Sequence, residues 1–283
     1  MSALTFATAQ LLRVLPRAGV SRVMGKLADH SWSPPLGRAV VGLYTRAYDV
    51  RLDECQQQGG WESFDQFFTR PLRHDARPLS GDERTIVSPA DGRLDAPGPV
   101  DDDATYLVKG RPYRAEELLG SAEEARRYKG GSACVVYLSP RDYHRVHSPV
   151  SGTLTEVRSM PGDYYPVNAI GIRHVPNLFA INRRVAIAVD TPDAVGLGRV
   201  TVVMVAAIVV GRITVSGVPG RDVPLGDHAP RTAIGRGDEL GQFHLGSTVV
   251  MFLEKRASGA WLAKEGPVRF GEALVRGGEG RHQ

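Results

Sequence analysis

The sequence predicts an α+β fold in which N-terminal amphipathic helices pack on a mostly antiparallel, two-layer β core. Apolar residues in the first fifty positions recur at helical spacing. From residue 130 onward, short runs rich in valine and isoleucine alternate with glycine and proline, which is typical of strands joined by turns. With 283 residues, the chain is long enough to bury a full core.

Residues 1–50 have the apolar spacing of amphipathic helices. Two groups of side chains follow the i, i+3, i+4, i+7 pattern. They are Val20, Val23, Met24 and Leu27, and Val40, Leu43, Tyr44 and Ala47. Pro16 and the Pro34-Pro35 pair divide the segment into about three helices. The stripes fit either a helical layer on the core or an element lying in a membrane interface, with Arg and Lys facing lipid phosphates.

Helices and short strands are predicted in the middle of the chain. Ser63 is a suitable N-cap for a helix near Ser63–Phe68. The stretch Glu116–Tyr128 is rich in Ala, Glu, Leu and Arg and predicts another helix. Between them, residues 84–110 are predicted to form short strands, with turns at Asp91-Gly92 and Pro97-Gly98.

The second half of the chain is predicted to be rich in strands, with Gly and Pro between most of them. The predicted strands are Cys134–Leu138, Gly152–Arg158, Val185–Val189, Val200–Val210, Ile213–Val215 and Thr248–Leu253. Residues 216–238 form a Gly/Pro-rich connection without clear periodicity. The tail from Gly277 is expected to be disordered.

The positive charge of the chain is concentrated at its N-terminus. The net charge is +4, but residues 1–51 alone carry seven Arg or Lys and two Asp, so the rest of the chain is slightly negative. A basic segment on a near-neutral body indicates an anionic partner, either lipid or nucleic acid. Nucleic acid is the weaker interpretation, because no recognition motif or pattern of stacking aromatics accompanies the charge.

Targeting and redox signals are few. The two cysteines, Cys55 and Cys134, are far apart and lack metal-binding spacing, which fits structural thiols in a reducing compartment. The N-terminus lacks the pattern of a signal peptide. The uncharged apolar run from Val200 to Gly211 is too short to cross a bilayer, so we expect no transmembrane helix.

Gly246-Ser247 is a candidate for chemistry on the backbone itself. Glycine has no Cβ, so its carbonyl is open to approach. Attack of the Ser247 hydroxyl on that carbonyl would convert the peptide bond into an ester, and loss of the Ser247 α-proton would then expel the Gly246 carboxylate. The dehydroalanine left behind would hydrolyse to a pyruvoyl group at a new chain end. The alternative interpretation is a buried strand that opens with a small residue.

Two other segments supply groups that could activate this serine. Ser88-Pro-Ala-Asp-Gly-Arg-Leu contains Asp91, and the segment from Leu138 to Gly152 contains His147. Histidine can accept the hydroxyl proton, and a carboxylate can fix the tautomer and orientation of the histidine. Each residue alone also fits a structural role, Asp91 as a turn cap and His147 as an ordinary strand residue.

Five motifs in order resemble the phosphatidylserine decarboxylases, specifically the bacterial and mitochondrial type with Leu-Gly-Ser-Thr. They span residues from about 64 to 253. The motifs are Phe67-Phe-Thr-Arg-Pro-Leu-Arg, the Pro-Ala-Asp-Gly segment, Asp142-Tyr-His-Arg-Val-His, Val175-Pro-Asn-Leu-Phe-Ala-Ile-Asn-Arg and Leu245-Gly-Ser-Thr. The chain differs from family members with long acidic tails, since it stops soon after its last strand.

The resemblance implies a self-processing carboxy-lyase that makes phosphatidylethanolamine from phosphatidylserine in phospholipid biosynthesis. Cleavage between Gly246 and Ser247 would convert Ser247 into the pyruvoyl cofactor, whose ketone serves as the electron sink that ordinary side chains lack. Asp91 would orient His147 as the general base of maturation. His144 or His147 would protonate the product. No metal or external cofactor is implied.

The resemblance also implies partners and location. We expect a peripheral protein on the cytoplasmic side of the cell membrane, bound to an anionic surface and acting on phosphatidylserine. Its two cleavage chains, residues 1–246 and 247–283, would stay partners, and a homodimer is expected. The predicted domains are a membrane-associating helical segment over 1–60, the catalytic domain over 61–276 and a disordered tail over 277–283.

The spacing of the two histidines predicts an irregular backbone. Side chains three apart in a regular strand point to opposite faces. His144 and His147 can therefore share a site only if a bulge or turn intervenes, and we expect one after Asp142. Tyr143 and Arg145 are expected to pack or pair elsewhere.

Three further residues are candidates for substrate contacts. Thr248 fits a strand by its β-branching, but its N–H or hydroxyl could also stabilise an oxyanion during the acyl shift. Asn177 and Phe179 follow a mixed apolar loop. That segment is either part of the core or a wall for an acyl chain beside the entrance to the site.

Two other classes of protein share part of this pattern. The segment from Ser148 to Asp163 resembles the hairpins of biotinyl and lipoyl carriers, and Gly237-Asp-Glu-Leu-Gly resembles a carrier hairpin too. The hairpin tip carries Ser151-Gly152 rather than an attachment lysine. A conventional serine hydrolase could use the same three residue types, but the Gly-x-Ser-x-Gly elbow is absent.

Overall fold

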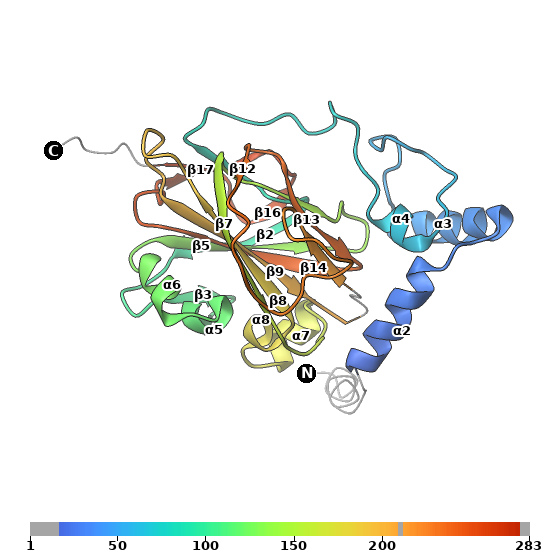
Figure 1. The fold of residues 1–283 in the computed structure, drawn as a ribbon, viewed down its shortest axis with the longest axis horizontal. Helices are drawn as coiled ribbons and strands as arrows, with labels where there is room; N and C mark the ends of the chain where they lie inside the picture. Colours follow the sequence, from blue (N-terminus) through green and yellow to red (C-terminus); the bar gives the residue numbers. More distant parts are fainter. Residues whose placement is uncertain (1–16, 209–211, 278–283) are drawn as a thin grey trace.

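A nine-stranded antiparallel sheet forms the centre of the molecule (Figure 1). The computed structural model describes residues 17–208 and 212–277. The strands run in the order β11-β7-β8-β9-β14-β5-β2-β16, and β12 also pairs with β7. Their bounds are β2 Gly92–Pro99, β5 Ser132–Leu138, β7 Gly152–Met160, β8 Arg184–Asp190, β9 Arg199–Ala206, β11 Gly226–His228, β12 Thr232–Ile234, β14 Ser247–Leu253 and β16 Gly266–Val268.

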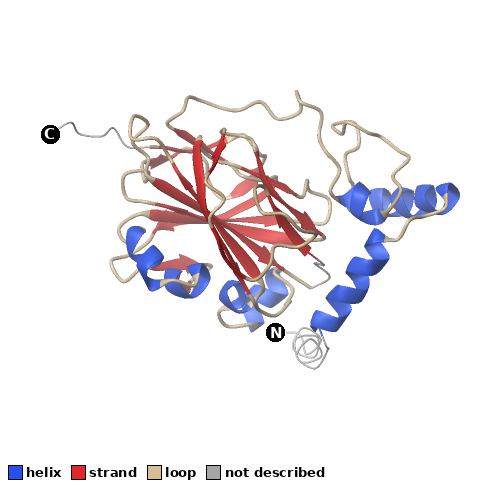
Figure 2. Ribbon diagram, viewed as in Figure 1, coloured by secondary structure: helices blue, strands red, loops and turns tan. Residues whose placement is uncertain are grey.

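Smaller sheets complete the β core. One has the order β10-β13-β6, a second has the order β1-β17-β15, and β3 and β4 form a separate pair. The bounds are β1 Thr85–Val87, β3 Thr105–Val108, β4 Arg111–Arg114, β6 Arg145–His147, β10 Arg212–Val215, β13 Glu239–His244, β15 Ala260–Trp261 and β17 Ala273–Arg276. With helices confined to the periphery (Figure 2), this architecture confirms the predicted α+β class.

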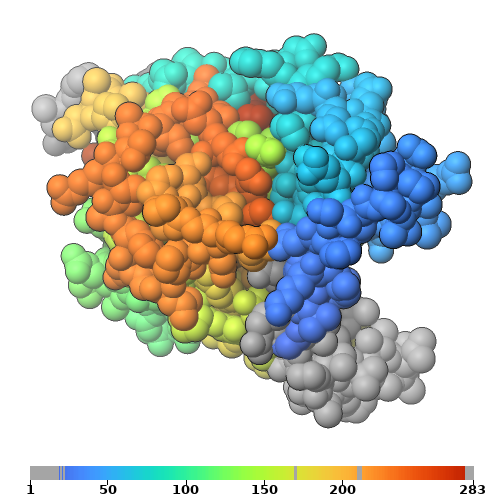
Figure 3. Space-filling view, turned by 45° about the vertical axis from the view of Figure 1, so that its right-hand side comes forward, coloured from blue at the N-terminus to red at the C-terminus, as the bar shows by residue number. Residues whose placement is uncertain are grey.

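The N-terminal helices lie on one side of the β core (Figures 1 and 3). They are α2 (Arg17–Asp29), α3 (Pro34–Tyr48) and the short α4 (Phe64–Phe68). Ser63 caps α4 as predicted, since its Oγ accepts the N–H of Gln66 at 3.2 Å. The helix expected before Pro16 lies outside the described residues.

Three large apolar side chains of α2 do not face the protein. Where the burial of its residues is described, the buried positions of α2 are the small residues Ser21, Gly25 and Ala28, whereas Val23, Met24 and Leu27 are exposed. In α3, Gly37 and Val41 are buried, but Leu36 and Leu43 are exposed, Leu43 by 72%. The apolar stripes are thus largely unpartnered in this chain.

Two local predictions in the middle of the chain were wrong. The single helix expected over Glu116–Tyr128 is split into α5 (Ala115–Leu119) and α6 (Ala122–Arg127). Gly120 adopts φ 68° there and ends the first helix, and Ser121 caps the second. The turn expected at Pro97-Gly98 is instead a bulge within β2, where the register with β5 shifts.

Other differences concern short edge strands. Residues 216–238 contain β11 and β12, which pair with β7, although their sequence showed no periodicity. Strands β15 to β17 after residue 253 were also not predicted. The predicted strand Val200–Val210 ends at Ala206, and the tail beyond residue 277 lies outside the described residues.

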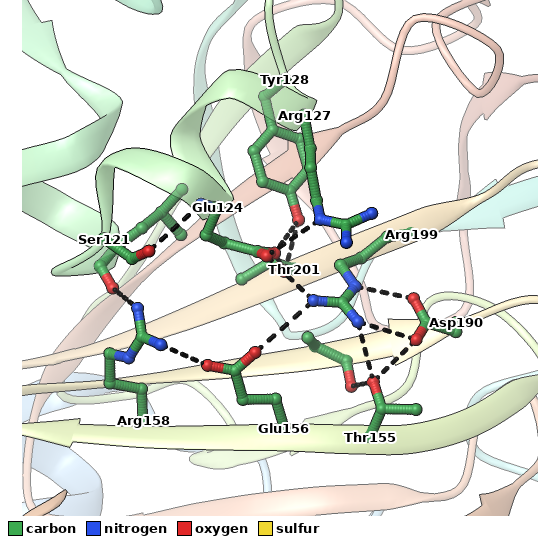
Figure 4. Close-up of polar contacts among 12 residues, drawn as sticks. Ser121, Glu124, Arg127, Tyr128, Thr155, Glu156, Arg158, Asp190, Arg199 and Thr201 are labelled. Carbon is green, nitrogen blue, oxygen red and sulfur yellow. Dashed lines mark hydrogen bonds and ion pairs between the residues drawn. The ribbon is translucent and has the colours of Figure 1, made fainter. Parts of the chain in front are cut away.

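Helices α5 to α8, with α7 at Ala169–His174 and α8 at Leu178–Ile181, lie below the central sheet in the view of Figure 1. A polar network fastens α6 to the sheet (Figure 4). Arg199 on β9 contacts both Asp190 and Glu124, at 2.7 and 2.9 Å, and these acids raise the pKa of its guanidinium. Tyr128 donates to Glu124 at 2.9 Å.

Both cysteines are buried as free thiols.

Among the described residues, no helix combines the length and apolar character needed to cross a bilayer.

Candidate active site

The Gly246–Ser247 bond lies at a corner where the chain passes from one sheet to another. Strand β13 ends at His244 in the three-stranded sheet, and β14 begins at Ser247 in the centre of the nine-stranded sheet. Ser247 pairs there with Leu138 of β5 and Ala206 of β9. At this corner, only Leu245 and Gly246 separate the end of β13 from the start of β14.

The hydroxyl groups at this corner are buried and unpaired. Within the described structure, Ser247 Oγ and Thr248 Oγ1 have no hydrogen-bond partner. An unpaired buried hydroxyl is costly and is often explained by function. A Cβ added to Gly246 would meet no atom within 4 Å outside its two chain neighbours, so the space beside its Cα is open.

His144 has a free ring nitrogen. Its Nδ1 lies 2.8 Å from the Asp142 carbonyl oxygen, which can only accept, so Nδ1 carries the proton and Nε2 has a lone pair. Nε2 is buried and has no partner within the described residues. Complete burial lowers the pKa of His144 to about 3, so the ring is neutral at pH 7.

The backbone brings His144 close to the corner. Its carbonyl oxygen accepts the N–H of Phe243 at 3.0 Å, two residues before Leu245. The Phe68 ring packs on the His144 ring, with 4.0 Å between their centroids, and Phe68 also belongs to one apolar cluster with Leu245. His144 and the residue preceding Gly246 therefore share a neighbour.

His147 has both ring nitrogens occupied. Nδ1 donates to the Gly237 carbonyl at 2.8 Å, and Nε2 accepts the Tyr143 hydroxyl at 3.0 Å. The ring stacks on Phe270 with 3.8 Å between centroids. Burial lowers the pKa of His147, so this ring is also neutral at pH 7.

Asp91 is held by an arginine that the sequence did not point to. Arg77 donates Nε and Nη2 to the carboxylate, the shortest contact being 2.6 Å, and also contacts Glu54 at 2.7 Å. The N–H of Phe270 donates to Asp91 at 2.8 Å. Arg77 lies outside every motif that we identified, so only the fold shows its role.

Phe270 links Asp91 to His147, because its backbone N–H donates to the Asp91 carboxylate and its ring stacks on the His147 ring. The N–H of His147 also donates to Pro89 at 2.8 Å, next to the Asp91 loop. No direct hydrogen bond joins Asp91, His147 and Ser247 among the described residues. Tyr143, which we expected to pack elsewhere, occupies the Nε2 position that a serine would take.

The irregularity between the two histidines lies mainly on the opposite strand. A turn closes before β6, where the Asp142 N–H donates to Ser139 at 2.9 Å. The register between β6 and β13 then shifts between Glu239 and Gly241, opposite His147 and Val146. Arg145 pairs with Glu239 at 2.7 Å rather than with either histidine, as expected, although Glu239 lies opposite His147 in the register.

The segment from Val175 to Arg183 approaches the corner through Asn182. This fully buried amide donates to the carbonyl of Ala206, the partner of Ser247, at 2.9 Å, and it binds both backbone polar groups of Tyr165. Phe179 is buried and stacks on Tyr113, whereas Asn177 is half-buried and donates to Glu117. Substrate contacts of Asn177 and Phe179 stay predictions.

A cavity of about 290 Å³ lies beside Asp91 and Tyr143. Five arginines and four acidic residues line it, which leaves a small excess of positive charge. The charged lining residues are Arg51, Arg70, Arg77, Arg141, Arg269, Asp49, Glu54, Asp91 and Asp142.

Comparison with known proteins gives a consistent result. Residues 64–276 match the family described as phosphatidylserine decarboxylase. The chain is 37% identical to the phosphatidylserine decarboxylase proenzyme of Anaeromyxobacter sp. (strain K), over 93% of this chain and 95% of that protein. It is 40% identical to the proenzyme of Bordetella avium (strain 197N), over 92% and 91%. This chain therefore belongs to the phosphatidylserine decarboxylase family.

Proposed function

We propose that Gly246–Ser247 is the processing site of this phosphatidylserine decarboxylase and that Ser247 becomes its pyruvoyl group. The observation that carries the proposal is the buried, unpaired Ser247 hydroxyl, next to a glycine with open space beside it. A strand that merely began with a small residue would not need an unsatisfied hydroxyl in the core.

Processing uses only groups of the chain and one water molecule. The Ser247 oxygen bonds to the Gly246 carbonyl carbon, the C–N bond breaks and the proton passes to the freed amine, giving an ester. Loss of the Ser247 α-proton then breaks the Cβ–O bond and releases the Gly246 carboxylate. The enamine left on residue 247 tautomerises, adds water and loses ammonia, which leaves a ketone.

Asp91 and His147 are proposed as the groups that start this reaction. Their link through Phe270, and the neutral state of His147, support the assignment. For His147 Nε2 to reach Ser247, Tyr143 must release it. His144 is the second candidate base, because its Nε2 lone pair is already free.

After maturation, the pyruvoyl carbonyl supplies the electron sink for loss of CO₂ from an amine-bearing substrate. The strands around residue 247 exclude water from the site, since Ser247, Thr248, Leu138 and Ala206 are all buried. His144, neutral and with Nδ1–H fixed on Asp142, can accept a proton at Nε2 and return it to the product. The cavity beside Asp91 suits entry of the headgroup.

Intact-mass analysis tests the proposal directly. We expect the purified protein to consist of residues 1–246 and a second chain over residues 247–283 that starts with a pyruvoyl group and lacks an α-amine. The summed mass of the two chains should equal the mass of the precursor plus one water and minus one ammonia. Ser247→Ala should stay one chain. An active wild-type protein that remains uncleaved would contradict the proposal.

We further infer that α2 and α3 attach the enzyme peripherally to an anionic membrane on the cytoplasmic side. The support is the exposure of Val23, Leu27, Leu36 and Leu43 on helices that also carry exposed basic side chains. We also expect a homodimer, which light scattering of the purified enzyme would test.

A further inference from the structure

We propose that helix α4 is the positioning element of the processing bond: Asp65 and Phe68 hold Leu245 in a strained conformation that directs the Gly246 carbonyl toward Ser247. Asp65 acts through His244, and Phe68 acts on Leu245 itself. This inference rests on the processing site proposed above and adds residues that contact neither Gly246 nor Ser247.

The strain is located at Leu245. Its φ is 90°, whereas the other non-glycine residues with positive φ in the described chain have values between 48° and 58°. The latter lie near the small left-handed region that side chains can occupy, and Leu245 lies beyond it. Such a conformation persists only where the surroundings enforce it, and it is often found at functional sites.

A polar contact fixes the residue before Leu245. His244 Nδ1 lies 2.8 and 2.9 Å from the two carboxylate oxygens of Asp65 and therefore donates to them. Arg212 contacts Asp65 at 3.1 Å and also pairs with Asp29 of α2. The end of β13 is thus tied to α2 and α4 by a partly buried network.

An apolar contact fixes Leu245 itself. Its side chain is only 6% exposed and forms one cluster with Phe68 of α4 and Ala28 of α2. Leu245 would lose this burial if it turned to a relaxed backbone conformation. Because the Phe68 ring also packs on His144, α4 belongs to the apolar cluster of the strained residue and contacts a candidate base.

The other side of the bond is equally immobile. Ser247 begins a strand that pairs along its whole length with β5 and β9. With His244 fixed on one side and Ser247 on the other, strain at Leu245 can be relieved only at Gly246. A glycine has the backbone freedom to adopt the orientation this requires, and the space beside it is open.

The test is the first-order rate at which pulse-labelled, full-length precursor is cleaved. Asp65→Ala should slow cleavage at least tenfold, and Asp65→Asn, which keeps an acceptor oxygen for His244, should recover part of the rate. Leu245→Gly should slow cleavage more than Leu245→Ala, because glycine adopts φ 90° without strain. Asp190→Ala is the matched control, since it removes a carboxylate from an arginine pair remote from the corner.

Two further measurements separate positioning from general stability. Melting temperatures are taken in a Ser247→Ala background, where Leu245→Gly should melt no lower than Leu245→Ala. Activity per titrated pyruvoyl group should stay near wild type in whatever fraction of Asp65→Asn matures. Asp65→Ala or Leu245→Gly cleaving at the wild-type rate would overturn the inference while leaving the processing site intact. Failure of the wild type to cleave would instead refute the processing site.

Discussion

Two buried histidines define the site at the level of single residues. Each donates Nδ1–H to a backbone carbonyl, so each keeps an unprotonated Nε2. They differ in what meets that atom: the Tyr143 hydroxyl binds Nε2 of His147, whereas Nε2 of His144 has no partner in the described part of the chain. The same tautomer therefore gives one free base and one base that must first lose its partner.

Substitution of these residues should separate maturation from turnover. His147→Ala and Asp91→Asn should accumulate precursor, because the proposed base or its orienting carboxylate is lost. His144→Ala should still cleave, at least partly, but should turn over lipid about 10²–10⁴-fold more slowly. Gels of each variant, alongside CO₂ release from carboxyl-labelled phosphatidylserine, provide the two readouts. If His147→Ala matures normally and His144→Ala does not, His144 is the base of maturation.

Burial of His144 also predicts a pH dependence of stability. The pKa of His144 is about 3 in the folded protein against 6.5 for the free side chain, so the unfolded chain binds the extra proton first. This contribution is fully present above pH 6.5 and is lost as the pH falls toward 3. In a Ser247→Ala background, urea unfolding of the parent should lose a few kcal/mol more over that range than unfolding of His144→Gln. Parallel curves would show that His144 titrates normally.

The sequence predicted the N-terminal helices, but it did not show which of their faces packs on the β core. Their periodicity is helical as predicted, but α2 packs through Ser21, Gly25 and Ala28. Small residues let the helix approach closely and leave Leu27 on α2 and Leu43 on α3 exposed, by 57% and 72%. An apolar surface that the chain itself leaves uncovered favours the membrane interpretation.

Charge reversal on these helices should weaken membrane binding. Lys26, Arg38 and Arg46 are exposed, so Lys26→Glu, Arg38→Glu and Arg46→Glu together should reduce sedimentation with phosphatidylglycerol vesicles. The defect should depend on salt, because exposed charges are screened. The matched control reverses Lys129, Lys255 and Lys264, which are exposed on other parts of the chain. Equal binding by both triple variants at low salt would exclude specific attachment through α2 and α3.

Across the whole molecule, the proposed processing bond joins two parts that cannot separate without unfolding. Strand β14, entirely buried, lies between β5 and β9 in the central sheet, and β16 and β17 pair with β2 and β1. The chain after Ser247 therefore contributes the middle of the core. Burial of each large apolar side chain in this part of the chain stabilises the folded state by about 1.5–3 kcal/mol.

The two cleavage chains should therefore remain associated after processing. We expect them to co-elute in native size-exclusion chromatography and to separate only in denaturant. The comparison is between wild type and Ser247→Ala, whose elution volumes should match because no strand pairing depends on the cleaved bond. Release of the chain over residues 247–283 under native conditions would show that the sheet reorganises after cleavage.

The sequence by itself determined the chemistry and the local elements. The glycine–serine junction and the valine-rich strands follow from residue type and short spacing, and the roles of Asp91 and His147 were predicted from the resemblance of their motifs to one family. Tertiary structure alone decided which face of α2 packs on the protein and that Arg77 holds Asp91. It also decided that the Tyr143 hydroxyl binds Nε2 of His147 and that the Asp65 carboxylate binds His244. Periodicity describes neighbours a few positions apart. Asp65 and His244 are separated by 179 positions, and only the packing of the helices against the end of β13 brings them together.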